Sequence, residues 1–280
     1  MHTNIRGVDS KLQSLGTILN IIKPSVLTVN ETFFENNRKL NLQGFLSFTL
    51  NRKYESGGGI SSSINECDRL NTLKVYEGNK GHEILITRHS QFIIPINVIN
   101  VYGVVESRNT NDKLNDCWEE VFNQIKKVEA KGELLVIIGD FNVHVGDIIY
   151  GNNVKRSHGG KLIKEFIDNS NYILLNSSDK AVNGPFTRVD PGNDNKKSVL
   201  DLCIVSKELE PYVECMLIDN NRNFTPYRSI SRNQIRLRII IHYWSHSKIS
   251  LWLVTQNKNN LIKASNGILT AQVGGRITKK

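Results

Sequence analysis

Hydrophobic residues recur at helical spacing in three segments of the chain. The first carries leucine or isoleucine at positions 12, 15, 18, 19 and 22 and ends before Pro24. The second runs from Asp112 to Lys131, with its apolar residues on one face, and the third covers Lys161–Asp168. We therefore predict three amphipathic helices.

Between the helices, apolar and β-branched runs predict strands. They are Val26–Asn30, Gly44–Leu50, Phe92–Tyr102, Leu134–Asn142, Tyr172–Leu175 and Val199–Val205. The run that begins at Leu134 has no polar alternation, so its strand should be buried on both faces. Residues 57–59 read as a glycine turn, and the Gly- and Asn-rich segment 189–197 reads as a loop. Strands that alternate with helices and also follow one another indicate an α/β sandwich of sheets flanked by helices.

Length and composition narrow the class of protein. The 280 residues are 39% hydrophobic and 22% charged, which excludes collagen-like, coiled-coil and wholly disordered chains. No apolar run is long enough to cross a membrane, and the N-terminus has no signal or transit pattern, so we expect an intracellular protein. The four cysteines have no C-x-x-C spacing and are expected to be reduced thiols.

The net charge of +9 is unevenly distributed. Residues 221–280 hold eleven lysines and arginines and no acidic residue, whereas the first 220 residues hold the other 25 basic and all 27 acidic residues. The body of the chain is therefore nearly neutral, and a strongly basic segment begins near Asn221. A DNA-binding extension or out-of-frame translation of a decayed element could each produce this shift.

Three carboxylates stand at the ends of apolar strands or within them, where desolvation is unfavourable unless a partner or a cation is present. Asp140 and Asn142 lie two residues apart and should project to one side of their strand, Glu31 follows another strand, and Asp201 lies in a third. Singly, each could be a capping or ion-pair residue, and Tyr102 could be an ordinary core aromatic. Together they suggest a site for Mg²⁺ and a phosphate.

Several short motifs occur in a fixed order along the chain. They are Asn4-Ile5-Arg6-Gly7, Asn30-Glu31-Thr32, Ser56-Gly57-Gly58-Gly59, Asn100-Val101-Tyr102, Gly139-Asp140-Phe141-Asn142 and Ser198-Val199-Leu200-Asp201. This series resembles the endonuclease/exonuclease/phosphatase superfamily, and in particular the apurinic-like endonuclease domain of non-LTR (LINE-type) retrotransposons. The segment Phe186–Gly192 and the later Phe224–Arg228 are similar to the same branch, so the resemblance spans residues 4 to about 228.

The resemblance implies a fold and a role for each motif residue. The fold is a four-layer α/β sandwich, in which helices flank two packed mixed β-sheets. Asn4 and Glu31 would hold the divalent metal, Mg²⁺ or alternatively Mn²⁺. Asp140 would orient or deprotonate the attacking water, and Asn142 and Tyr102 would contact the phosphate. Asp201 would orient a C-terminal histidine.

The chain departs from the family pattern at its C-terminal end. The family closes with Ser-Asp-His, whereas no aspartate follows Asp219 here. His246, in Trp244-Ser245-His246, is the candidate partner of Asp201, and His242 is an alternative. We divide the chain into an endonuclease/exonuclease/phosphatase domain over residues 1–228, with a shortened first strand and an uncertain last one, and a basic tail over residues 229–280, out of frame or disordered.

The resulting prediction is a Mg²⁺-dependent phosphodiester hydrolase that nicks DNA and derives from a non-LTR retrotransposon. It would act as a monomer on DNA, in the nucleus if its target is genomic, with no membrane and no known protein partner. One alternative is an inactive remnant that binds nucleic acid weakly through the basic tail, since loss of Ser-Asp-His could inactivate the enzyme. Another keeps the fold but takes a phospholipid or inositol phosphate as substrate.

Overall fold

The computed structural model describes residues 1–35, 37–52, 57–68, 70–79, 81–107, 110–146, 155–182, 186–190, 193–219, 236–242 and 250–251. For residues 188–190, 193–197, 219, 236–242 and 250–251 it describes the backbone alone.

Two mixed β-sheets form the centre of the fold. The larger has eight strands in the order β10-β14-β15-β1-β2-β4-β3, with β16 beside β15, and the smaller has six in the order β5-β6-β7-β8-β13-β9. The larger sheet contains β1 (His2–Asn4), β2 (Val26–Asn30), β3 (Phe45–Leu50), β4 (Ile60–Asn65), β10 (Ala181–Val182), β14 (Val213–Asp219), β15 (Arg236–His242) and β16 (Ser250–Leu251). The smaller sheet contains β5 (Thr72–Glu77), β6 (Glu83–His89), β7 (Ile96–Tyr102), β8 (Leu134–Asp140), β9 (Tyr172–Leu174) and β13 (Asp201–Ser206).

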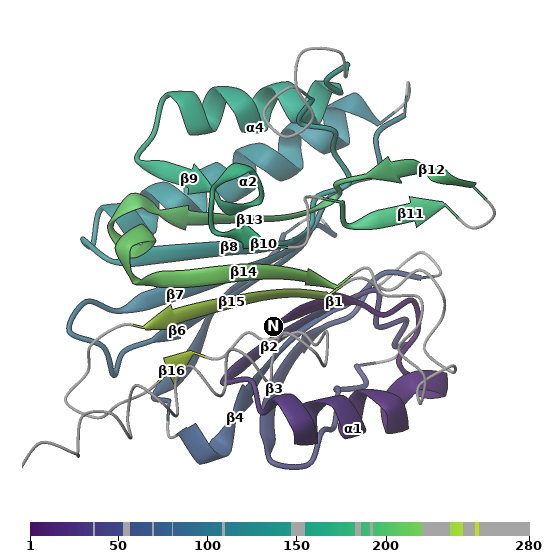
Figure 1. Ribbon diagram of the computed structural model, residues 1–280, viewed down its shortest axis with the longest axis vertical. Helices are drawn as coiled ribbons and strands as arrows, with labels where there is room; N and C mark the ends of the chain where they lie inside the picture. The colour runs from purple at the N-terminus through teal and green to yellow at the C-terminus, as the bar shows by residue number, and fades with distance from the viewer. Residues whose placement is uncertain are drawn as a thin grey trace, which may run out of the picture.

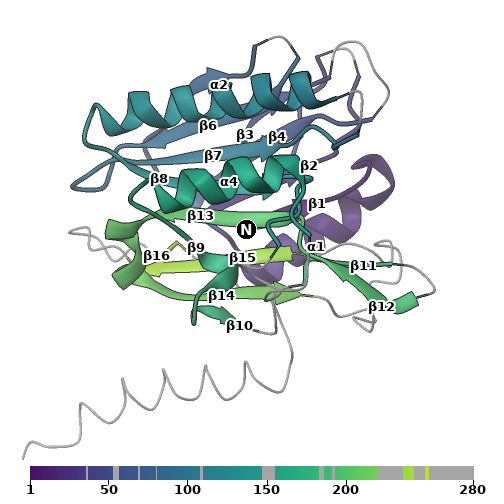
Figure 2. The ribbon, with the colours of Figure 1, turned by 90° about the horizontal axis from the view of Figure 1, so that it is seen from above.

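Helices cover the outer faces of both sheets. Figures 1 and 2 show α1 (Leu12–Ile22) on the larger sheet, and α2 (Asn111–Glu129) and α4 (His158–Asp168) side by side on the smaller one. Short 3-10 helices occur at Asp9–Lys11, Glu66–Asp68, Leu175–Ser177 and Lys207–Tyr212. The predicted four-layer α/β sandwich is therefore confirmed. Within the described ranges, none of the helices is both long enough and apolar enough to cross a membrane.

Strand β8 shows how the sequence pattern sets these layers. Leu134, Val136 and Ile138 point into the cluster of buried side chains that includes the layer between the sheets. Leu135 and Ile137 point to the other side, into the cluster beneath α2 and α4. Because every residue of β8 is buried, its sequence is continuously apolar until the strand reaches Asp140.

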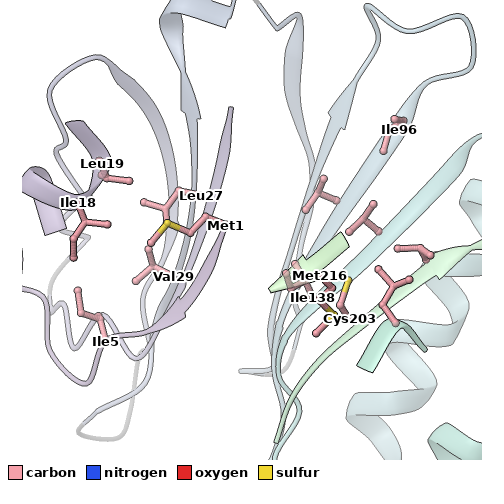
Figure 3. Close-up of a cluster of buried hydrophobic side chains, with 14 of the residues drawn as sticks. Met1, Ile5, Ile18, Leu19, Leu27, Val29, Ile96, Ile138, Cys203 and Met216 are labelled. Carbon is pink, nitrogen blue, oxygen red and sulfur yellow. The ribbon is translucent and has the colours of Figure 1, made fainter. Parts of the chain in front are cut away.

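Figure 3 shows part of the first cluster. The side chains of Leu27 and Val29 lie near Ile18 and Leu19 of α1, while Ile138 lies near Cys203 and Met216 at the sheet–sheet contact. Burial of this apolar surface is the main contribution that holds the four layers together.

Most predicted elements agree with the structure, with boundaries shifted by a few residues. The predicted loop over 189–197 is wrong, because β11 (Arg188–Asp190) and β12 (Asn193–Ser198) pair there as an antiparallel hairpin. The Pro-Gly dipeptide between the two strands is a common turn sequence, and the flanking strands are polar, so they lack the apolar alternation that identifies a strand. None of the four cysteines forms a disulfide with another described residue.

Strand β15 lies beyond the predicted domain boundary at residue 228. It pairs antiparallel with both β14 and β1 in the larger sheet. A segment that the sequence assigned to the tail, residues 236–242, thus belongs to the sheet. The boundary at residue 228 stays a prediction.

Candidate active site

The polar motif residues meet where strands of both sheets end. Alternation along β7, β8 and β13 places Tyr102, Asp140 and Asp201 on the faces that look toward the larger sheet. In that sheet, Asn4 is the last residue of β1 and Glu31 directly follows β2. Asp140 and Asp201 are direct neighbours across the β8–β13 ladder, and Tyr102 is the neighbour of Asp140 on its other side.

The side chain of Asn4 links the two sheets at this point. Its Nδ2 atom donates to Glu31 Oε1 at 2.7 Å and to Asp140 Oδ2 at 2.8 Å. The Tyr102 hydroxyl also donates to Glu31 Oε1, at 3.1 Å. One amide and one phenol therefore hold two carboxylates close together in a partly buried place.

The structure gives a separate reason for the residue type at each of three positions in the Gly139-Asp140-Phe141-Asn142 motif. A Cβ atom on Gly139 would lie 1.8 Å from the carbonyl oxygen of Val101, so β7 and β8 can approach only with glycine there. Phe141 is fully buried, with its ring 5.0 Å from that of Trp118. Asn142 adopts φ +52°, which asparagine tolerates better than most residues, and its Nδ2 donates to Gly103 O at 2.9 Å. Its backbone N–H donates to Asp140 Oδ1 at 3.1 Å.

The glycine turn supports the segment that carries Glu31. The N–H of Thr32 donates to Gly59 O at 3.0 Å, and the N–H of Gly7 donates to Glu31 O at 2.7 Å. Gly59 N in turn donates to Glu83 Oε2 at 2.7 Å, and Glu83 is almost fully buried. Residues 57–59 all have positive φ, which explains why this turn is made of glycine.

Asp201 is held by two residues outside the predicted site. The Thr187 hydroxyl accepts from the backbone N–H of Asp201 at 3.0 Å, which gives a structural reason for the Phe-Thr motif. With its proton on Nε2, His2 donates to Asp201 Oδ1 at 3.2 Å, and its Nδ1 accepts from the Thr28 hydroxyl at 3.0 Å. His2 is completely buried, so it cannot contact a substrate directly.

Burial shifts the pKa of each of these groups. Burial and the charge of Asp201 raise the pKa of Asp140 to about 7, against the hydrogen bonds from Asn4 and Asn142. Burial likewise raises the pKa of Asp201 to about 7, although a hydrogen bond between its carboxyl group and the Thr187 side chain lowers it. Burial lowers the pKa of His2 to about 3, so a neutral imidazole donates to Asp201 and the contact is not an ion pair.

Burial and the charge of Glu31 raise the pKa of Tyr102 above its ordinary value. Its phenol therefore stays protonated near neutral pH and can act as a hydrogen-bond donor.

The oxygen atoms near Asn4 fit a magnesium ion. The Oδ1 atom of Asn4 is buried and has no hydrogen-bond partner among the described residues, and the Glu31 carboxylate lies beside the same amide. Hard oxygen ligands in small number suit Mg²⁺, which keeps several of its waters. Over the described ranges, no group of three or more His, Cys, Asp or Glu side chains is placed to hold a metal ion.

Six of the seven predicted site residues are found at this place: Asn4, Glu31, Tyr102, Asp140, Asn142 and Asp201. His246 lies outside the described residues, and its role as the partner of Asp201 stays a prediction. His242 lies in β15, for which the backbone alone is described. The chemical roles of the six residues are likewise predictions.

Sequence reasoning missed His2, Thr28 and Thr187. His2 stands in a three-residue strand at the N-terminal end of the sequence, where no periodicity shows which way a side chain points. The position of Thr187 within the Phe-Thr-Arg motif was the one available signal, but that motif gave no indication that its hydroxyl serves Asp201.

Residues 96–229 match a sequence family described as endonuclease-reverse transcriptase. No curated protein sequence matches this chain significantly.

Several solved structures share the fold at low sequence identity. The 3′ phosphatase NExo from Neisseria, bound to a product DNA hairpin, is 15% identical with a TM-score of 0.65, covering 84% of this chain and 96% of its own. An AP endonuclease from Archaeoglobus fulgidus is 15% identical with a TM-score of 0.64, over the same shares. The endonuclease domain of TRAS1, a telomere-specific non-LTR retrotransposon, is 14% identical with a TM-score of 0.60, covering 87% of this chain and 99% of its own.

The family match covers strands β7, β8 and β13, which carry Tyr102, Asp140 and Asp201, and the structural matches extend the shared fold to both sheets. Residues 96–229 of this chain thus match the endonuclease-reverse transcriptase family, and the chain as a whole shares its α/β sandwich fold with these nuclease and phosphatase structures.

Proposed function

We propose that this chain is a divalent-metal-dependent phosphodiesterase that nicks DNA. The observation that carries the proposal is the Asn4 amide, which bridges Glu31 and Asp140 while its own Oδ1 atom has no hydrogen-bond partner in the part of the chain that the structure describes. The description of the matching family and the similarity to the TRAS1 endonuclease fold support an origin in a non-LTR retrotransposon.

In this mechanism Asp140 is the general base. Its pKa of about 7 lets it exist as a carboxylate at neutral pH and still be basic enough to accept a proton from water. The backbone N–H of Asn142 and the amide of Asn4 fix its two oxygens, so one carboxylate orientation is presented to the water.

Tyr102 and Asn142 would bind the phosphate. The Tyr102 hydroxyl is a donor next to Glu31, and Asn142 stands beside Asp140 with its side chain half-exposed. A Mg²⁺ ion held by Glu31 and Asn4 would neutralise charge on the phosphoryl oxygens, and Mn²⁺ could take the same place. Asp201, oriented by His2 and Thr187, adds the negative charge that helps to keep Asp140 basic.

Nicking of supercoiled plasmid by the full chain tests the proposal. We expect relaxed circles with Mg²⁺, none with EDTA, and none with Asp140→Ala. Asp116→Ala is the matched control, because Asp116 lies exposed on α2 away from the site. Activity that survives in Asp140→Ala but not with EDTA would show that the base is wrongly assigned. A folded protein that never nicks would favour the inactive remnant with weak nucleic-acid binding.

A further inference from the structure

An aromatic side chain stands exposed beside the candidate active site. Phe33 follows Glu31 by two residues and is 44% exposed, whereas its neighbours Thr32 and Phe34 are buried. Large aromatic side chains are normally kept from water in a folded protein. The exposure of Phe33 therefore needs a reason.

The backbone of Phe33 makes the exposure more unusual. Phe33 has φ +57°, a conformation that is unfavourable for a bulky residue. Hydrogen bonds hold the segment in it, because Phe33 N donates to Gly58 O at 2.8 Å and Val8 N donates to Thr32 O at 3.1 Å. Strained backbone of this kind occurs preferentially at functional sites.

Two glycines hold the ring in place. A Cβ atom on Gly7 would lie 3.2 Å from Cδ2 of Phe33, and one on Gly57 would lie 3.4 Å from Cε1. The ring thus rests against backbone on either side, so its position is restricted although much of its surface is open. A restricted aromatic ring loses little further entropy when a ligand packs on it.

Two arginine side chains contact residues of the candidate site or lie close to it. The Arg6 side chain is 46% exposed, and its Nε atom is 3.9 Å from Glu31 Oε2. The Arg52 guanidinium lies 5.6 Å from the Tyr102 ring centroid, with Nε donating to Glu83 Oε1 at 2.5 Å. Cations that follow a phosphate backbone, together with an exposed aromatic ring, are the features by which proteins bind unpaired nucleotides.

We propose that Phe33 stacks on a nucleobase of the DNA strand whose phosphate occupies the candidate active site. The inference rests on the proposed function, since it requires DNA at that place, and it adds a contact to a base where the other residues contact the phosphate. Because every base has a flat apolar face, the contact tolerates any sequence but requires a base that is unstacked from its neighbour.

Fluorescence of 2-aminopurine tests the contact without hydrolysis. The full chain is titrated in EDTA into a single-stranded oligonucleotide of thymidines with 2-aminopurine at every third position, and emission and anisotropy are recorded together. We expect the wild-type protein and Phe33→Trp to quench the emission on binding. Phe33→Asn and Phe33→Leu should lose the quenching and bind about 5- to 20-fold more weakly.

Phe33→Asn separates stacking from a merely structural role. Asparagine accepts positive φ better than phenylalanine, so this variant should fold and melt at the same temperature as the wild type or above it. If Phe33 served only to fill the space between Gly7 and Gly57, Phe33→Asn would melt lower and quench normally. Phe33→Leu keeps an apolar side chain between the glycines and provides a second test of the same point.

Tyr212→Leu is the matched control. Tyr212 is 38% exposed, and it lies in the 3-10 helix that follows β13. Asp201 is at the other end of β13, so replacement of Tyr212 should leave the quenching unchanged. Normal quenching by Phe33→Leu and Phe33→Asn, or no quenching by the wild type, overturns the inference whatever the plasmid assay shows. The protein could instead show Phe33-dependent quenching and fail to nick plasmid. That result would support the stacking contact and would count only against the proposed hydrolysis.

Discussion

Replacement of Asp140 by asparagine should stabilise the metal-free protein, by an amount that grows with pH. In the folded state burial and the charge of Asp201 raise the pKa of Asp140 from 3.8 to about 7. A group whose pKa is raised by folding favours the folded state while it is protonated, and that contribution disappears as the pH rises through the folded-state pKa. Asparagine does not titrate, so Asp140→Asn should lose nothing over this range.

The size of the effect follows from the two pKa values. Each pKa unit corresponds to about 1.4 kcal/mol, so ionisation of Asp140 destabilises the fold by about 2 kcal/mol at pH 5 and about 4 kcal/mol at pH 8. Asn4 and Asn142 donate to its two oxygens, and one of them would face the amide group of asparagine. The protonated carboxyl meets the same mismatch, so asparagine mimics it well. Removing one charge also eases ionisation of Asp201, so we expect a measured gain of roughly 2 to 4 kcal/mol at pH 8.

Urea unfolding in EDTA at pH 5 and pH 8 measures this gain. Asp116→Asn, at an exposed position on α2, is the control and should change the free energy of unfolding by less than about 0.5 kcal/mol at both pH values. An Asp140→Asn variant whose stability relative to wild type is the same at pH 5 and pH 8 would refute the reasoning, because it would show that Asp140 titrates normally in the folded protein.

Two further predictions concern residues that support the site. Gly139→Ala should fail to fold, or lose more than about 3 kcal/mol in the free energy of unfolding, because its Cβ atom would lie 1.8 Å from the Val101 carbonyl oxygen. Urea unfolding measures this loss. The control is Gly16→Ala, in open space on α1, which should gain up to about 1 kcal/mol in the same free energy. His2→Ala should leave Asp201 without its buried donor and lower both kcat and Tm, with a loss of roughly 1–3 kcal/mol in stability. His2→Gln should recover part of both, because its amide can donate. An Ala variant with wild-type kcat would show that orientation of Asp201 by His2 is unimportant.

The sequence predicts those helices and strands in which the same faces are buried along the whole element. Strand β8 is apolar on both faces because both of its faces are covered, and the apolar stripe of α2 faces a single layer. Strand β4 was not predicted, since three serines form its centre and alternation is absent. They are buried because Ser61 and Ser63 hydrogen-bond the side chains of Thr49 and Ser47 on β3, a partnership that the sequence of β4 alone does not reveal.

The same limit applies to the candidate site. Asp140 and Glu31 could be identified because a carboxylate at the end of an apolar strand needs a partner, which is a local argument. His2 could not, because its importance depends on Asp201, far along the chain and in the other sheet. A residue whose surroundings come from distant strands can be identified only when the arrangement of those strands is known.

The bridge from Asn4 to Asp140 has a consequence for how the protein folds. The two residues are 136 positions apart, and His2 and Asp201 are 199 apart, so no short fragment of the chain contains either pair. Contacts with such large sequence separation form late and slowly, because the intervening chain must first lose its conformational freedom. We therefore expect the hairpins within each sheet to form before β1 contacts β15, β8 and β13, and the candidate active site to be the last part that a refolding molecule completes.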